Sequence, residues 1–515
     1  MPYIPFGQQT LNYAPTPQRF DEIFDELRRG WRRLKREKLL RILISRLHQK
    51  QHVDAIAYTL DARARGHMDF VPRTLLLWVL ADTHAYRGQS REPDDKSVHR
   101  LLNLTWRLSA AQEALQPFPS NPFLALRNIA VQQFSSQELL LEPTVGRNWI
   151  IFGALAANHR VRELLEATTG LPLEDAISFV LLLSSACVQS EGTPLRTTIF
   201  QYARNVFNAN TKLRDTLVAH DGRSLRGVVR VDFKQEDIFA PTPFIRYPLI
   251  RLGEEVCIVD PICAAKTAEH YPAQIVAEFG DQHHKKALTE LYEAYINKRV
   301  AEVFPHDSTV GEKLRGMIDG RVCDQFVRLS PDCVLLVEIK SGALADHKSV
   351  SLSGERLFNM LDGILKEGVE QLVETRRCLR AIQAIRTCDR VILLLVTREN
   401  LRLPHGDMLS DMMPKLDLSL SQYEGSENFF VCCIDEFDEL LDIHAAGDLP
   451  LSQFFSIDSA IGDDAARSKN GVGGRLRTAK RVHVARHLRA AYDAATNHCG
   501  LLLNRMKATH DLANR

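Results

Sequence analysis

The 515-residue sequence has no apolar run long enough to cross a membrane. The best candidate, "AISFVLLLSSAC" (residues 176–187), has about half of the roughly 20 residues that a spanning helix needs, so we expect a buried helix there. The first residues, "MPYIPFGQQTLNYAP", lack the basic segment followed by an apolar one that marks a signal peptide. These absences predict a soluble, cytoplasmic protein with no membrane partner.

Cysteine pairs with C-x-x-C spacing, excess charge and internal repeats are also lacking; Cys432 and Cys433 are adjacent. Ten cysteines are scattered without C-x-x-C spacing, which argues against a zinc ribbon or a disulfide scaffold and for reduced thiols. The net charge of +1 carries no preference for nucleic acid on average. What the chain does have is 45% apolar and 25% charged residues, the composition of a globular protein, and a length that predicts about three or four modules.

The spacing of apolar residues and the charge change along the chain, and these changes predict a multidomain fold with four regions. Residues 1–225 show apolar residues at helical spacing and are expected to be a mostly α-helical region that recognises substrate or a partner protein, or forms a homo-oligomer. Short β-branched runs predict a small β-rich connector over 226–281. Residues 282–445 follow the order helix, strands, helix, strand, strand, which predicts a compact α/β unit. Residues 446–515 are expected to be a basic tail, ordered only by a polyanion.

Positive charge is concentrated in two segments, Arg28 to Lys50 and Arg467 to Lys507. The first is read either as a solvated helix face or as a surface that contacts phosphates. We expect phosphate contacts without sequence reading, because few aromatic residues are interleaved for base stacking.

The stretch "LLVEIKSG" (residues 335–342) ends an apolar strand with a carboxylate and an ammonium two positions apart. A strong turn signal, the tripeptide SPD at 330–332, separates this strand from the preceding "RVCDQFVRL". If these three residues form the loop of a hairpin, Leu329 faces Cys333, and the numbers of paired residues sum to 662. A two-residue loop would shift this register by one.

In the three-residue register Asp324 lies directly opposite Glu338, with Cβ atoms about 5 Å apart. Lys340 shares their face, because side chains alternate along a strand. The shifted register would send Asp324 to the other face. The alternative to a functional cluster is an ordinary strand end with a surface Glu–Lys pair.

Two carboxylates at this distance repel each other unless a positive charge lies between them. Oxygen ligands with this spacing suit Mg²⁺, for which Mn²⁺ can substitute, and such an ion promotes attack of water on a phosphodiester. A nearby ammonium orients the water or stabilises the charge that develops.

Asp324, thirteen intervening residues and then Glu338-Ile339-Lys340 at the end of an apolar strand resemble the active-site motif of the PD-(D/E)XK nuclease superfamily, whose fold is restriction-endonuclease-like. The resemblance covers about a third of the chain and departs from the motif at Cys323, where the family has proline. A literal proline–aspartate pair at Pro331 and Asp332 lies only five residues before Glu338 and is read as the hairpin tip.

The resemblance implies a catalytic site and a metal site in the C-terminal half. It assigns the metal to Asp324, Glu338 and Ile339 and the activation of water to Lys340. A glutamate on the preceding helix, Glu293 or less favourably Glu290, and a glutamine on the following helix are then expected to complete the catalytic set. That glutamine is Gln371 in "EGVEQL".

The predicted function is Mg²⁺-dependent hydrolysis of nucleic acid, DNA before RNA, in the manner of bacterial restriction or anti-phage enzymes. The alternative is a non-catalytic nucleic-acid-binding or assembly protein that keeps a nuclease-like fold. Metal-dependent cleavage separates the two.

Overall fold

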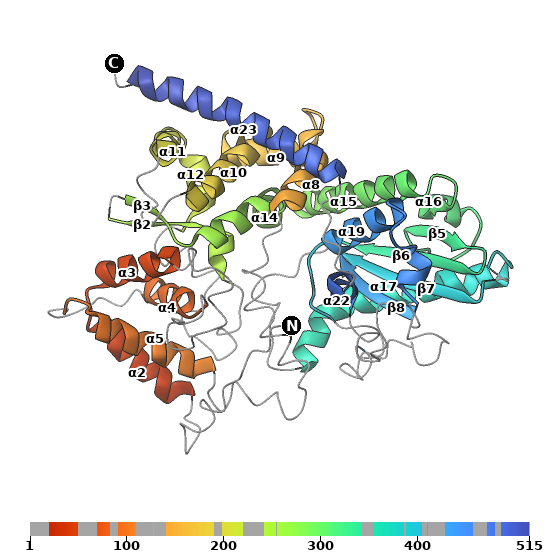
Figure 1. The fold of residues 1–515 in the computed structure, drawn as a ribbon, viewed down its shortest axis with the longest axis horizontal. Coiled ribbons are helices and arrows are strands. Elements are labelled where there is room, and N and C mark those ends of the chain that lie inside the picture. Colours follow the sequence, from red (N-terminus) through yellow and green to blue (C-terminus); the bar gives the residue numbers. More distant parts are fainter. Residues whose placement is uncertain are drawn as a thin grey trace. The chain divides into compact units, whose positions relative to one another are not determined.

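A computed structural model gives the fold (Figure 1). It describes residues 20–49, 70–82, 91–109, 127, 141–189, 198–219, 242–253, 255–341, 354–385, 388–403, 409, 428–456, 471–478 and 486–513. The chain divides into two compact units, each built from segments that are distant in sequence. Unit 1 comprises residues 1–138, 183–267 and 349–352, and unit 2 comprises 139–182, 268–348 and 353–515.

Unit 1 contains the first helices and a three-stranded sheet around one shared core. Phe24 packs edge-on against Trp31 and Trp78, and the buried Arg73 pairs with the buried Asp260 at 2.6 Å. Its main elements are α2 (Phe20–Arg32), α3 (Arg36–Gln49), α4 (Phe70–Ala81), α5 (Asp95–Ser109), α11 (Thr198–Ala209), α12 (Thr211–Leu217), β1 (Val218–Ala219), η4 (Pro243–Ile245), β2 (Leu249–Leu252) and β3 (Glu255–Ile258). The predicted helical region and connector are therefore not separate modules, because their apolar faces cover each other.

The connector prediction is right for one hairpin and wrong for its second half. Strands β2 and β3 pair antiparallel, and β1 joins β2 in parallel. The remainder, Pro261–Phe279, is the helix α14, whose alanine-rich sequence favours a helix. The predicted run "RGVVRVDF" lies outside the described residues.

Unit 2 contains a five-stranded mixed sheet in the order β4-β5-β6-β7-β8. β5 pairs antiparallel with β4 and β6, whereas β7 is parallel to both β6 and β8. Its elements are α8 (Leu141–Gly153), α9 (Arg160–Thr169), most of α10 (Leu173–Gln189), most of α14, α15 (Gln282–Val303), β4 (Ser308–Val310), α16 (Gly311–Arg315), β5 (Gln325–Ser330), β6 (Cys333–Lys340), α17 (Gly354–Ala381), β7 (Arg390–Thr397), β8 (Phe429–Cys433), α19 (Ile434–Ala445), α20 (Leu451–Phe454), α22 (Val472–Thr478) and α23 (Arg486–Ala513). The predicted order of helix, strands, helix, strand and strand is thus observed.

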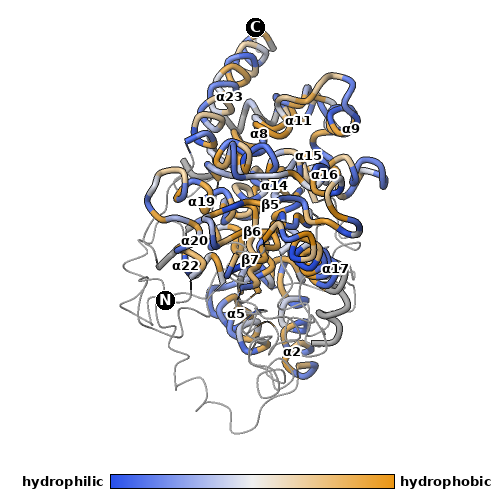
Figure 2. The backbone as a smooth tube through the Cα atoms, turned by 90° about the vertical axis from the view of Figure 1, so that its right-hand side faces the viewer, coloured by the Kyte–Doolittle hydropathy of each residue, from blue (hydrophilic) through white to orange (hydrophobic). Residues whose placement is uncertain are grey.

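Helices α15 and α17 cover opposite faces of this sheet. Gly368 of α17 lies so close to β7 that an added Cβ would be 2.6 Å from the side chain of Leu395, the register partner of Glu338. Asn297 of α15 accepts a hydrogen bond from Gln325, which is paired with Val337 on the other face. Figure 2 shows the hydrophobic colouring concentrated on β6 and β7, between helices whose colouring is mixed. Buried on both sides, these strands are continuous apolar runs.

The hairpin between β5 and β6 has the predicted register near its open end and a different turn. From Gln325 to Arg328 the paired numbers sum to 662, but Ser330 rather than Leu329 faces Cys333, with a bulge between. The predicted three-residue loop is therefore wrong. The extra residue of the bulge compensates for the shorter loop, so the face on which each later side chain points is the predicted one.

The C-terminal segment is not a detached tail. Helix α22 packs on β8 and α19, and α23 packs along α8. The buried face of α23 repeats at helical spacing: Leu488, Ala495, Cys499, Leu502 and Met506. The three arginines of α23, Arg486, Arg489 and Arg505, are exposed on its other faces.

Gly146 permits the close crossing of α8 and α23. A Cβ at this position would lie 2.2 Å from the carbonyl oxygen of Leu488, a backbone atom that cannot move without its helix. We expect Gly146→Ala to destabilise the docking of α23 by about 1–3 kcal/mol, the usual range for overpacking. Hydrogen exchange of the α23 amides measures the effect. Gly153→Ala, whose Cβ would be 3.6 Å from Trp149, is the control and should leave that exchange unchanged; equal effects of both changes would contradict the close crossing.

Within the described segments, no single helix is both long and apolar enough to span a bilayer. One bent pair, Arg160–Thr169 with Leu173–Ser185, passes that test jointly at an angle of 55°. The buried helix expected at residues 176–187 is confirmed over its first residues, since Ala176, Phe179 and Leu183 in α10 are all buried.

Candidate active site

The carboxyl end of β6 brings a carboxylate, an ammonium and an amide together. Lys340 Nζ lies 2.9 Å from Glu338 Oε1 and donates a hydrogen bond of 2.6 Å to Oε1 of Gln371 on α17. The Glu338 residue is only 2% exposed. The pair is thus not a solvated surface ion pair, and Gln371 contacts Lys340 directly.

Asp324 approaches the same strand end from the hairpin partner. It lies one residue before β5, and its Oδ2 accepts a hydrogen bond of 2.8 Å from the backbone N–H of Ile339, between Glu338 and Lys340. The carboxylate thus replaces a backbone carbonyl as the acceptor for the Ile339 N–H. Thr375 of α17 accepts from the Cys323 N–H at 2.8 Å and holds the preceding residue.

Glu293 is half-buried on α15, within electrostatic reach of Asp324 and Lys340. It precedes Asn297 by one helical turn, and Asn297 is bonded to Gln325, the neighbour of Asp324, at 2.7 Å. The weaker candidate Glu290 is exposed and pairs with Lys286 at 3.8 Å. Of the two glutamates, Glu293 is therefore the one that lies near Asp324 and Lys340.

The carboxyl groups at this strand end have raised pKa values. Burial, followed by the charge of Asp324, raises the pKa of Glu338 to about 8, although Lys340 opposes the shift. Burial also raises the pKa of Asp324 and of Glu293, and the charge of Asp324 contributes to the latter. Burial and mutual repulsion disfavour the ionised forms of these neighbouring carboxyl groups. A bound cation would stabilise the ionised forms.

The donor set fits a hard divalent cation with few protein ligands. Glu338 Oε2 is buried and accepts no hydrogen bond from the described residues, so one carboxylate oxygen is left to bind an ion. Among the described residues, no three His, Cys, Asp or Glu side chains are grouped closely enough to hold a metal. Two carboxylates with a main-chain carbonyl, which is all that Ile339 can offer, are a set typical of Mg²⁺, because Mg²⁺ keeps several waters.

The tip of the hairpin takes no part in this cluster. Asp332, the aspartate of the literal proline–aspartate pair, is exposed and accepts a hydrogen bond from Ser330. Cys323 stands where the motif has proline. Its thiol is buried beside Asp324 and donates to the Gln325 carbonyl at 3.2 Å. Of the two aspartates, Asp324 is therefore the one that lies at the carboxyl end of β6.

Several basic side chains of the two segments already have partners within the protein. In the N-terminal segment most of the described basic side chains form ion pairs: Arg28–Asp25, Arg32–Asp82, Lys35–Glu92, Lys38–Glu92, Arg41–Glu37, Arg41–Glu255 and Arg46–Asp95. In the C-terminal segment Arg475 is buried and donates to the Phe454 carbonyl, so the prediction of a phosphate contact is wrong for that residue. Lys50 and Arg467 lie outside the described residues.

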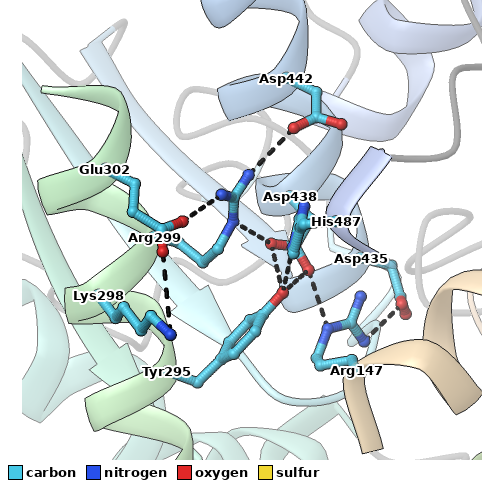
Figure 3. Close-up of polar contacts among 9 residues, drawn as sticks. All are labelled: Arg147, Tyr295, Lys298, Arg299, Glu302, Asp435, Asp438, Asp442 and His487. Carbon is cyan, nitrogen blue, oxygen red and sulfur yellow. Dashed lines mark hydrogen bonds and ion pairs between the residues drawn. The ribbon is translucent and has the colours of Figure 1, made fainter. Parts of the chain in front are cut away.

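A second polar cluster, shown in Figure 3, joins α8, α15, α19 and α23. The Tyr295 hydroxyl donates to the buried carboxylate of Asp438 at 2.9 Å, and Arg147 Nε donates to the same carboxylate at 2.9 Å. Burial, with the charges of Arg299 and Arg147, lowers the pKa of His487 to about 4. The neutral His487 ring, whose Nε2 lies 3.1 Å from the Tyr295 hydroxyl, therefore donates to it, because the hydroxyl proton goes to Asp438.

This second cluster has the character of an internal brace. Arg147 also pairs with Asp435 at 2.8 Å, and Arg299 pairs with Asp442 at 3.0 Å. Each acid thus faces an arginine, and the members come from four separate helices. No pattern of spacing in the sequence pointed to it, because its residues are up to 340 positions apart.

Comparisons with known proteins found no match to this chain among protein-family models, curated proteins or solved structures. The interpretation of the site therefore depends on its own geometry.

Proposed function

We propose that the chain is a metal-dependent nuclease of the PD-(D/E)XK type, with DNA as the first substrate to test. One observation carries the proposal. Lys340 is held by Glu338 and Gln371 at the strand end where Asp324 is bonded to Ile339, so residues from β6, α17 and the start of β5 meet at one place. The carboxyl ends of parallel strands, here β6 and β7, are where open α/β sheets bind ligands.

In this proposal Asp324, Glu338 and the Ile339 carbonyl would hold Mg²⁺ or Mn²⁺. The bound ion supplies Lewis-acid activation of water and neutralises charge on the phosphate. The Lys340 ammonium, fixed by two oxygen acceptors, orients the attacking water and stabilises the developing negative charge. The lysine ammonium can only donate, so Gln371 accepts through its Oε1. The Nε2 group of Gln371 is then left to donate to a phosphate oxygen.

The direct test is cleavage. Plasmid DNA and single-stranded DNA are incubated with the purified chain in Mg²⁺, in Mn²⁺ or in EDTA, and the products are separated on a gel. Cleavage that requires the metal supports the proposal. Binding without cleavage in any metal would instead select the alternative, a non-catalytic nucleic-acid-binding or assembly protein.

Metal binding should stabilise unit 2 in a pH-dependent way. The folded pKa of Glu338 is raised to about 8, above its usual value near 4.5, so folding favours the protonated form and stability falls as pH rises between those values. Mg²⁺ binds the ionised form. We therefore expect Mg²⁺ to raise the melting temperature by several degrees at pH 8, since binding at about 100 times Kd contributes about 2.7 kcal/mol, and to have little effect at pH 5.5.

Glu338→Gln should remove both the Mg²⁺ effect and much of this pH dependence. The exposed Glu290→Gln is the control and should keep both. A Mg²⁺-induced rise that is the same at both pH values, or that survives in Glu338→Gln, would contradict the assignment of this carboxylate as a ligand.

A further inference from the structure

The short helix α16 begins in backbone contact with the candidate site. The Gly311 N–H donates to the Asp324 carbonyl at 2.8 Å. A Cβ at Gly311 would lie 2.6 Å from the Cys323 carbonyl oxygen and 3.3 Å from the Asp324 Cα, so only glycine allows this approach. The start of α16 is therefore fixed against the backbone of the aspartate.

Arg315 ends this helix, one turn after Gly311 and about 6 Å further along its axis. It is exposed, and its positive charge acts on the carboxyls of both Asp324 and Glu293. The Arg315 guanidinium is therefore at the edge of the candidate active site and is exposed to solvent. Lys313, two positions earlier, is also exposed but points about 200° away around the helix.

Arg315 differs from several arginines of unit 2 in having neither a carboxylate nor a carbonyl group as a partner among the described residues. Arg328 donates to the Ala384 carbonyl. Arg321 pairs with Glu370, Arg377 with Glu374, and Arg299 with Asp442 and Glu302. Over the residues that the structure describes, Arg315 forms no ion pair and no side-chain hydrogen bond. A long basic side chain next to carboxyl groups, yet bonded to none, is in place for a ligand that the protein chain does not supply.

We propose that Arg315 binds a backbone phosphate of the nucleic acid strand, next to the phosphodiester that is cleaved at Asp324, Glu338 and Lys340. This inference depends on the proposed function and deepens it by naming a substrate contact outside the metal site. Arginine suits the role, because its planar guanidinium can donate two parallel hydrogen bonds to one phosphate. The contact is to the backbone, so it carries no base preference.

The test compares Arg315→Gln with Lys313→Gln, which removes the same charge from the same helix. Binding to a mixed-sequence duplex and to a single strand of equal length is measured by fluorescence anisotropy at several KCl concentrations, in a Lys340→Ala background that slows turnover. We expect Arg315→Gln to weaken binding about 10-fold or more, as for loss of a charged hydrogen bond, and to reduce the salt slope by about 0.9 on duplex. Lys313→Gln should change affinity by less than about twofold.

Cleavage kinetics with an intact Lys340 separate the possible failures. Arg315→Gln should raise KM with a small change in kcat, and Arg315→Lys should restore much of the salt slope. If the wild type cleaves but Arg315→Gln behaves like Lys313→Gln, the phosphate contact is wrong and the nuclease stands. If the wild type neither binds nor cleaves, the proposed function fails and this contact fails with it.

Discussion

Replacing Lys340 by alanine should lower the rate of DNA cleavage by about 10²- to 10³-fold, the typical loss for one electrostatic contact to a transition state. Its ammonium is held 2.9 Å from Glu338 and 2.6 Å from Gln371, so it is already in position before substrate binds. Binding of DNA should change little, because the contact is made chiefly in the transition state. The substitution should therefore lower kcat.

The Lys340 experiment needs saturating metal. The lysine also opposes the rise in the pKa of Glu338, so its removal makes that carboxyl harder to ionise and weakens metal binding at neutral pH. Measuring kcat across Mg²⁺ concentrations at pH 8.5 separates this indirect loss from the direct one. Lys366→Ala, at an exposed position of α17, is the matched control. Equal cleavage by Lys340→Ala and the wild type would show that the active site lies elsewhere.

Asp438→Asn should destabilise unit 2 by about 3 kcal/mol. The substitution keeps the shape of the side chain and removes one charge from the brace of Figure 3, leaving Arg147 and Tyr295 buried around a neutral amide. Removing one partner of a buried ion pair typically costs about 3–5 kcal/mol. The lower end applies, because Arg147 keeps Asp435 and Arg299 keeps Asp442.

A chain with two compact units need not unfold in one step, so the Asp438 effect should be measured locally. Hydrogen exchange of amides in α8, α15, α19 and α23 reports the stability of unit 2 alone. Glu302→Gln is the control: its carboxylate pairs with Arg299 at 2.6 Å but is 44% exposed, so its loss should cost less than about 1 kcal/mol. Equal effects of the two substitutions would show that the buried brace contributes no more than a surface ion pair.

The sheet of unit 2 was largely predictable, because its signals are local and redundant. The apolar runs at β6, β7 and β8 stand out in the sequence, and a period of two fixes which residues share a face. The cluster of Asp324, Glu338 and Lys340 followed from that register. The bulge at Leu329 was not predictable, since a turn signal locates a reversal of the chain without fixing how its residues pair.

The division of the chain and the placement of Arg315 could not be predicted from the sequence for a different reason. Unit 2 takes residues 139–182 from the region predicted to be a separate helical module, and only tertiary packing reveals that exchange. Arg315 looked like one basic residue among many. The sequence shows neither that it lacks an ion-pair partner among the described residues nor that Gly311 lets its helix approach Asp324. Contacts between distant segments carry no periodic signal.

The crossing of α8 and α23 has a consequence for how the protein is made. Leu488 follows its contact Gly146 by 342 positions, so at about 5–20 residues per second the ribosome delivers it roughly 17 to 70 s later. Throughout that interval the α8 surface that will receive α23 lacks this partner. We expect nascent chains stalled before residue 486 to engage chaperones and to be sensitive to protease around α8. A separately supplied peptide spanning residues 486–513 should protect them.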